Sequence, residues 1–186
     1  MASSWQLKEL IFKSIKDVLS NTVSVAWNDN KTKQNKTKQY CDILINNEIQ
    51  IKIKSGQIDK SKQKLTLSGY RLGRFGNDEK KITEFINGND SSIITVPYHK
   101  NKEKEQIDER HIYQIYYLPK DILKISEQEK NNWKKKKNNK FLTNEKGVKF
   151  KIVSSMSCQV WWTIPLKLIE EKSEILKIPS FIPTKQ

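Results

Sequence analysis

The chain has 186 residues and a formal net charge of +14, because 35 Lys and Arg residues outnumber 21 Asp and Glu residues. This length suits one domain with its own core, and no run approaches the ~20 apolar residues that a membrane-spanning helix requires. Cys41 and Cys158 are too few for a disulfide framework, and the N-terminus lacks a signal-peptide pattern. These features argue against a membrane protein or a disulfide-bonded secreted protein. We expect an intracellular or virion protein with reduced cysteines.

The first predicted elements are a helix and three strands. Apolar residues recur at helical spacing over 4–20, which predicts an amphipathic helix. A short strand is expected over 22–27. Strands over 40–46 and 48–54 form a hairpin, because the pair Asn46-Asn47 tolerates the positive φ of a tight turn.

The second strand of this hairpin alternates strictly between a polar and an apolar face. Ile49, Ile51 and Ile53 form the apolar face, and the polar face carries Glu48, Gln50, Lys52 and Lys54, joined by Asp42 from the paired strand. An acidic residue followed by an amide, a spacer and Lys suits metal-dependent phosphodiester hydrolysis. Mg²⁺ accepts carboxylate and carbonyl oxygens, and Lys can hold the attacking water. A solvated face of a Lys-rich protein is the alternative.

The remaining elements follow from shorter patterns. Helices are expected over 78–87 and 122–130, and strands over 91–98, 111–118, 150–153 and 158–164. Trp161-Trp162 lies in an apolar strand pattern, so at least one of the two should be in the core. We expect a single domain over 1–164 and an amphipathic, Pro-punctuated C-terminal tail over 165–186.

The hairpin resembles the PD-(D/E)XK nuclease superfamily, which includes restriction, mismatch-repair and Holliday-junction enzymes. The resemblance covers about fifteen residues, in which Asp42 is followed by Gln50-Ile51-Lys52. It implies an α/β fold with a restriction-endonuclease-like core, in which a mixed β-sheet is flanked by helices. It also implies that Asp42 and Gln50 hold Mg²⁺ and that Lys52 positions the water. Glu48 is a spare carboxylate on the same face.

A second alignment of the motif is open. Lys52-Ile53-Lys54-Ser55 also lies where many members carry Glu-x-Lys-Ser, which would put Lys52 in place of the second metal ligand. A charged Lys does not bind Mg²⁺, so this alignment implies an inactive site. We prefer the alignment on Gln50, because it keeps a carbonyl ligand.

Basic residues outside the motif predict contacts to nucleic acid. Lysines cluster before the hairpin, including Lys33 and Lys36, and again at Lys134, Lys135, Lys136 and Lys137. Clustered ammonium groups bind phosphates without sequence preference. The Gly-rich segment 65–76 carries Arg71 and Arg74, two of only three arginines, and Arg can contact phosphates or guanine edges.

The sequence therefore predicts a protein that binds double-stranded DNA and resembles a metal-dependent endonuclease. The alternative is a non-catalytic basic DNA-binding or packaging protein that retains the nuclease fold. A weaker alternative is a basic protein associated with RNA. We expect no membrane partner, and the choice between a monomer and a homodimer stays open.

Overall fold

The computed structural model describes residues 4–19, 21–27, 41–75, 78–99, 115–153 and 158–173. Its helices are α1 (Ser4–Leu19), α2 (Glu79–Asn87) and α3 (Leu166–Ser173), with short 3-10 helices η1 (Gly73–Phe75) and η2 (Lys120–Leu123). Its strands are β1 (Val25–Trp27), β2 (Ile43–Ile45), β3 (Ile49–Asp59), β4 (Lys64–Arg71), β5 (Ser92–His99), β6 (Tyr116–Leu118), β7 (Lys134–Lys136), β8 (Asn139–Thr143), β9 (Lys149–Val153) and β10 (Gln159–Pro165). The described residues thus form a mixed α/β fold dominated by antiparallel strands, and none of their helices could cross a membrane.

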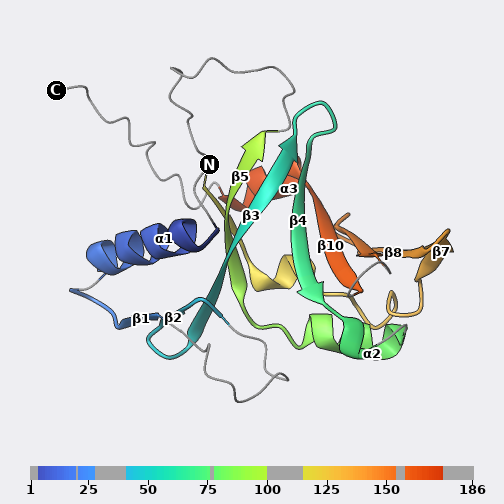
Figure 1. Ribbon diagram of the computed structural model, residues 1–186, viewed down its shortest axis with the longest axis horizontal. Helices are drawn as coiled ribbons and strands as arrows, with labels where there is room; N and C mark the ends of the chain where they lie inside the picture. The colour runs from blue at the N-terminus through green and yellow to red at the C-terminus, as the bar shows by residue number, and fades with distance from the viewer. Residues whose placement is uncertain are drawn as a thin grey trace.

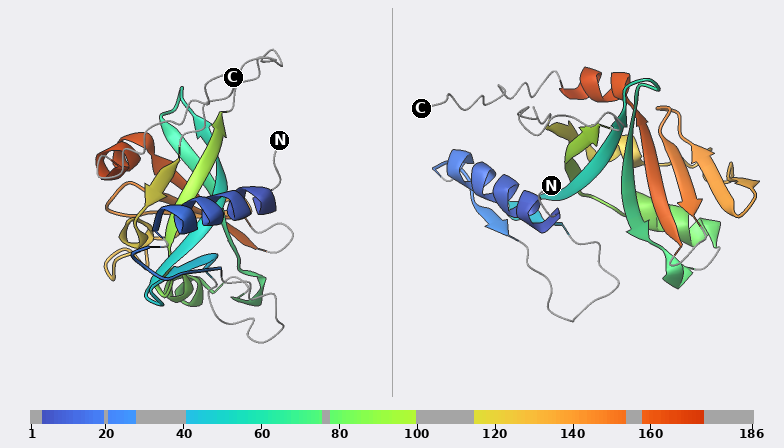
Figure 2. Two further views of the ribbon diagram at one scale, coloured as in Figure 1. Left: turned by 90° about the vertical axis from the view of Figure 1, so that its left-hand side faces the viewer. Right: turned by 45° about the horizontal axis from the view of Figure 1, so that its top comes forward.

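The long strand β3 joins two parts of one sheet (Figure 1). On one side, β1, β2 and β3 form an antiparallel meander, and β5 runs parallel to β3 from the pair Ile51–Ser92 onward. On the other side, the far end of β3 pairs with β4, and the order continues through β10, β9 and β8 to β7. In Figure 2, α1 lies with β1 and β2 at one side of the molecule, and β7 and β8 lie at the other.

The alternation of β3 separates two environments. Ile51 and Ile53 are buried in a small cluster with Ile11 of α1 and with the β2 residues Ile43 and Ile45. Because neighbouring side chains of a strand point to opposite faces, Gln50, Lys52 and Lys54 point away from α1. The predicted alternation is confirmed from Gln50 to Lys54, whereas Ile49, which was expected on the apolar face, is 51% exposed at the start of the strand.

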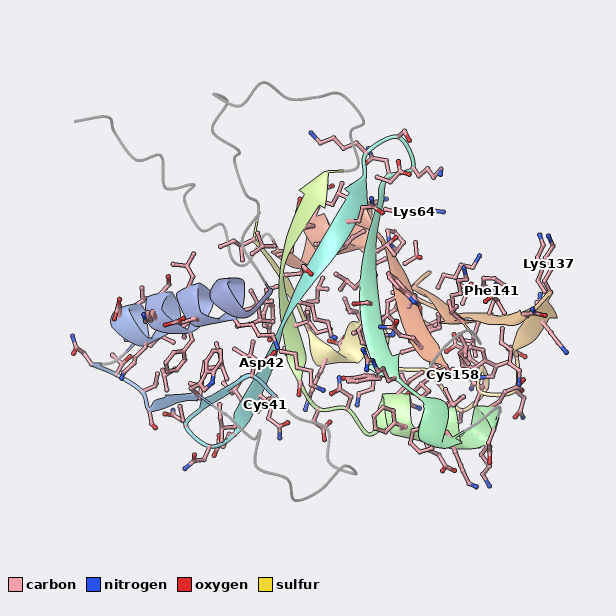
Figure 3. All side chains as sticks on the ribbon, in the orientation of Figure 1. Cys41, Asp42, Lys64, Lys137, Phe141 and Cys158 are labelled. Carbon is pink, nitrogen blue, oxygen red and sulfur yellow. The ribbon has the colours of Figure 1, made fainter. Side chains whose placement is uncertain are left out.

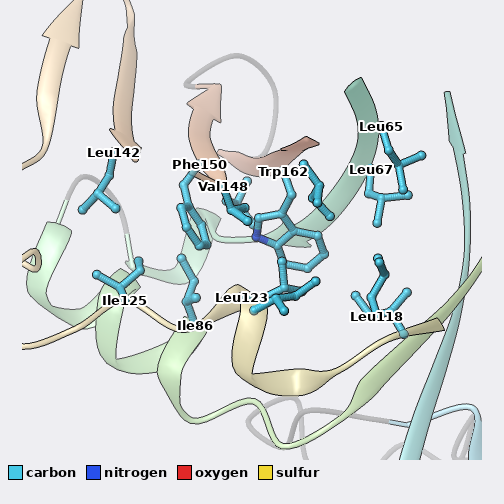
Figure 4. Close-up of a cluster of buried hydrophobic side chains, with 14 of the residues drawn as sticks. Leu65, Leu67, Ile86, Leu118, Leu123, Ile125, Leu142, Val148, Phe150 and Trp162 are labelled. Atoms are coloured by element: carbon cyan, nitrogen blue, oxygen red, sulfur yellow. The ribbon is translucent and has the colours of Figure 1, made fainter. Parts of the chain in front are cut away.

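The main core lies on the inner face of strands β4, β10, β9 and β8 (Figure 4). Trp162 and Phe150 are almost fully buried there, against side chains of α2 and η2 such as Ile86 and Leu123. Ile169 of α3 joins this cluster. The expectation that one Trp of the 161–162 pair is in the core is confirmed for Trp162.

Most predicted elements are present, and their ends follow local hydrogen bonds. Asp78 caps α2, because its Oδ1 accepts from Lys81 N at 3.0 Å, and Gly88 ends that helix. The positive φ angles of Asn46 and Asn47 confirm the predicted turn. Of the strand expected over 111–118, residues 111–114 lie outside the described part of the chain.

The helix expected over 122–130 is wrong. Only Lys120–Leu123 is helical, as the 3-10 turn η2, and the chain then continues through extended residues and turns. Side chains from distant parts of the chain form hydrogen bonds with backbone groups that would bond to each other in an α-helix. Asn144 Nδ2 donates to the carbonyls of Ile122 and Lys124 at 3.1 and 2.9 Å, and Ile125 N donates to Asn87 Oδ1 at 2.8 Å.

Two segments that we interpreted by charge and glycine content are strands instead. The first part of the Gly-rich segment 65–76 belongs to β4, which spans Lys64–Arg71, with Leu65 and Leu67 fully buried. The Lys134 cluster forms β7 and the turn to β8, in which Lys137 adopts a φ of 54°. In the first segment, apolar residues at every second position favour a strand in spite of the glycines. In the second segment, the lysines form a strand because they pair with β8.

Gly56 marks the point at which β3 begins to pair with β4. A Cβ at this position would collide with the side chain of Leu67, and it would lie 2.9 Å from Leu65 Cδ1 and 3.1 Å from the Thr66 carbonyl oxygen. We expect Gly56→Ala to lower the free energy of unfolding by about 1–3 kcal/mol, as overpacking of a core does. Urea denaturation followed by circular dichroism measures this loss.

The neighbouring exposed residue provides the control. Ser55→Ala should change the free energy of unfolding by less than about 0.5 kcal/mol. Equal stability of the two variants would show that the close contact of β3 with β4 at Gly56 is not a constraint.

Candidate functional site

Asp42 lies at a break in the pairing along β3. The β2 partners of β3 reach only as far as Ile51, and the β4 partners begin at Gly56. Asp42 occupies the start of this interval, where its backbone N donates to Ile51 O at 2.7 Å. Its Oδ2 accepts from Ile53 N, also at 2.7 Å. Asp42 thus replaces a strand partner, because its backbone N and its carboxylate hold the β3 backbone on either side of Lys52.

Lys8 of α1 holds the other carboxylate oxygen. Its Nζ lies 2.6 Å from Asp42 Oδ1, and the Asp42 side chain is 21% exposed. This ion pair ties α1 to the break in β3. No sequence pattern singles out Lys8, because a Lys on the polar side of a surface helix is common.

Lys52 is buried between the strands, with 5% of its surface exposed. Its Nζ donates to Tyr70 Oη at 2.7 Å and to Asn89 Oδ1 at 2.9 Å, and it lies 4.4 Å from the centroid of the Tyr70 ring. These partners come from β4 and from the residues after α2. They are 18 and 37 positions away in the chain, so no local sequence motif predicts these contacts.

Burial changes the acid–base behaviour of this group of side chains. The pKa of Lys52 falls from 10.5 to about 7, mainly because burial penalises the ammonium and secondly because Lys54 is close by. Burial also lowers the pKa of Lys54, to about 8. The Asp42 carboxylate opposes both shifts, so it lies near both lysines. Burial, and then Asp42, raise the pKa of Tyr70.

Lys54 faces two aromatic rings. Its Nζ lies 5.6 Å from the centroid of the Tyr70 ring and 5.7 Å from that of the Trp162 ring. We find no hydrogen-bond acceptor for this ammonium among the described residues. Because an ammonium carries three donors, Lys54 has the capacity to bind an anion.

The other predicted motif residues do not gather around Asp42. Gln50 Oε1 accepts from Ser91 Oγ at 3.3 Å, just before β5 begins. Glu48 is exposed in the turn between β2 and β3. The structure therefore brings Asp42 together with Lys52 and Lys54, and it adds three partners that we did not select: Lys8, Tyr70 and Asn89.

The predicted nucleic-acid contacts lie elsewhere or outside the described residues. Lys134–Lys137 are exposed on β7 and its turn, far from Asp42 in Figure 3. Arg71 is exposed at the end of β4. The backbone of Arg74 is part of η1, but its side chain, like Lys33 and Lys36, lies outside the described part of the structure.

A magnesium ion fits the side chains around Asp42 poorly. Mg²⁺ prefers anionic oxygen ligands, and Asp42 is the one carboxylate among these groups. Both of its oxygens already accept hydrogen bonds, from Lys8 and Ile53, and the Gln50 carbonyl accepts from Ser91. Across the described residues, no three His, Cys, Asp or Glu side chains form a group that could hold a metal ion.

No protein-family model, curated protein or solved structure matches this chain. Function must therefore be argued from the site. One carboxylate faces three lysines, so with all groups ionised the local charge is positive. Such a site attracts an anion such as phosphate and repels a divalent cation.

The lowered pKa values predict how stability depends on pH. Above about pH 7 the folded protein loses the Lys52 proton, whereas the unfolded chain keeps it up to about pH 10.5. The unfolded state then binds more protons, so the free energy of unfolding rises with pH over this interval. We expect Lys52→Met to reduce this rise in urea denaturation measured from pH 6.5 to 9.5.

Lys60→Met is the matched control, because Lys60 is exposed in the turn after β3. It should leave the pH dependence close to that of the wild type. An unchanged slope in Lys52→Met would contradict the burial of a titrating ammonium at this position.

Proposed function

We propose that this chain is a DNA-binding protein with the topology of a PD-(D/E)XK nuclease core, in which the site at Asp42 holds phosphate rather than a metal ion. The order of elements supports the nuclease lineage. A helix, an antiparallel meander of three strands, a helix and further strands correspond to α1, β1–β3, α2 and β5–β6. Strand β4 is an addition between the meander and α2.

The observation that carries the proposal is the position of Lys52. Asp42 is bonded to both neighbours of this residue, and Lys52 fills the interior beside the carboxylate with an ammonium. This arrangement favours the alignment of the motif on Lys52-Ile53-Lys54 over the alignment on Gln50. In this alignment, the Lys52 ammonium occupies the position at which the superfamily carries its second acidic metal ligand.

The charge of the whole chain supports DNA as the source of the phosphate. The net charge of +14 attracts a polyanion from a distance. The exposed hairpin of β7 and β8 presents Lys134–Lys137 at one end of the sheet, where neutralised phosphates release their counterions. These contacts bind the DNA backbone and carry no sequence information.

Duplex binding should be strongly salt-dependent, and the hairpin should contribute to it. We expect Lys135→Gln/Lys137→Gln to weaken binding to duplexes of any sequence and to lower the log–log salt slope by about 2, since each phosphate contact contributes about 0.9. Fluorescence anisotropy of a labelled duplex at about 50 and about 200 mM salt measures both effects.

The double variant Lys13→Gln/Lys16→Gln on exposed positions of α1 removes the same charge and serves as the control. It should leave the slope almost unchanged. Affinity that does not respond to salt, or equal losses in the two variants, would refute a specific role for the hairpin.

The motif itself can be tested with metals. We expect the wild-type protein not to cleave duplex DNA with Mg²⁺ or Mn²⁺, and Lys52→Glu to create Mg²⁺ binding that calorimetry detects, because it places a second carboxylate beside Asp42. Circular dichroism shows whether the variant folds.

The opposite result would support the alignment on Gln50 and an active endonuclease. In that case the wild type cuts DNA with Mg²⁺ or Mn²⁺, and Asp42→Ala abolishes cleavage. Gln50→Glu then tightens metal binding, because a hard cation gains from an anionic oxygen.

A further inference from the structure

The sheet has a second face that the site at Asp42 does not use. Strands β4, β10, β9, β8 and β7 are neighbours, and their alternate residues Leu67, Trp162, Phe150 and Leu142 are buried in the main core. On each strand, the residues that alternate with these buried ones point away from the core. We call this surface the outer sheet face.

The register places its side chains in rows, because directly paired residues of antiparallel strands lie on the same face. One row runs across all five strands as Lys134, Phe141, Lys151, Trp161 and Ser68. The row on one side of it contains Lys136, Asn139, Val153, Gln159 and Arg71. The row on the other side contains Thr143, Lys149, Thr163 and Thr66.

The five strands carry no acidic residue. Their cations on the outer sheet face are Lys64, Arg71, Lys134, Lys136, Lys149 and Lys151. None of these six forms an ion pair with a described residue, whereas Lys140, which alternates to the inner side, contacts Glu79 at 2.7 Å. The outer sheet face is therefore positive without internal compensation.

Two aromatic rings interrupt the cations. Phe141 has the Lys149 Nζ 4.6 Å and the Lys151 Nζ 5.9 Å from its ring centroid. In Figure 3 it lies on the side of β8 away from α2. Trp161 lies two strands away, at about 10 Å given the usual spacing of strands. Both rings are only partly buried.

We propose that the outer sheet face binds single-stranded nucleic acid, with bases stacked on Phe141 and Trp161 and phosphates on the surrounding lysines and Arg71. Aromatic rings on a flat, cationic surface recognise the faces of bases that are not already stacked in a duplex. Polar Thr, Ser, Asn and Gln side chains in the same rows can donate to bases and phosphates. The inference uses none of the residues around Asp42, but it shares Lys134 and Lys136 with the hairpin that we propose to bind duplex DNA. The ring variants described below leave these lysines unchanged, so they test the two proposals separately.

The test separates stacking from apolar contact and from charge. The probes are fluorescein-labelled oligothymidylate and oligouridylate of about 15 nucleotides, a length that suits sheet surfaces of this kind. Phe141→Leu and Trp161→Leu remove the rings but keep apolar side chains. We expect each to weaken binding of both probes about tenfold or more, because stacking on one ring is worth that much.

The matched controls are Phe141→Tyr and Trp161→Phe, which keep a ring and should bind within about threefold of the wild type. Duplex binding should not change in any of the four variants. Thermal denaturation shows whether each variant is folded, and if Trp161→Leu unfolds, Phe141→Leu alone decides the outcome.

Three results would overturn the proposal. The first is wild-type affinity of Phe141→Leu for both probes. The second is an equal loss of duplex and single-strand binding, which would indicate a change of fold or charge. The third is binding of poly-L-glutamate as tight as that of the oligonucleotides with the same dependence on the rings, which would make the surface a site for acidic protein segments. A preference for oligouridylate over oligothymidylate would identify RNA as the ligand.

Discussion

The break in pairing along β3 is the constraint on which the arrangement of the molecule depends. Where β2 has ended and β4 has not begun, the backbone of β3 has lost a strand partner, and Asp42 supplies the missing acceptor to Ile53 N. The same carboxylate binds Lys8 and so holds α1 against β3. An unpaired backbone group in the interior costs about as much as a lost hydrogen bond, so the break is stable because Asp42 fills it. Lys52 and Lys54 are brought to the carboxylate as a consequence, since they alternate along the same strand.

Burial of Lys52 is costly, and its surroundings explain how the fold accommodates it. A buried ammonium needs acceptors and nearby negative charge. Tyr70 and Asn89 give the acceptors, and Asp42 gives the charge. Burial still dominates, and the pKa of Lys52 falls to about 7. An incoming phosphate would add negative charge and favour the protonated form of both lysines. Anion binding at this position would thus be coupled to proton uptake near neutral pH, which a site built for a divalent cation would not show.

The sequence predicted the parts of this structure that depend on neighbouring residues. The alternation of Ile51 and Ile53 with Lys52 and Lys54 gave the faces of β3, and Asp78 and Gly88 gave the limits of α2. The prediction failed where distant side chains determine the backbone conformation. At residues 122–130, Asn144 and Asn87 form hydrogen bonds with backbone groups that a helix would use. It failed for the same reason at the site. Lys8, Tyr70 and Asn89 reach Asp42 and Lys52 from three different elements, and only the folded sheet brings them together.

The site at Asp42 and the outer sheet face differ in the burial and pairing of their lysines, and this difference affects their roles. Around Asp42, Lys52 is buried and Lys8 and Lys54 are half-buried, and their charge is compensated in part by a carboxylate and by aromatic rings. On the outer sheet face the lysines are exposed or half-buried, and none has an acidic partner among the described residues. Exposed, uncompensated cations act through screened, long-range attraction, which salt weakens. A buried cation acts only on a group that reaches it, and it is shielded from salt. Contacts at the outer sheet face and at the β7–β8 hairpin should therefore govern how fast and how tightly the polyanion associates, whereas the site at Asp42 can act only on a phosphate that is already in place.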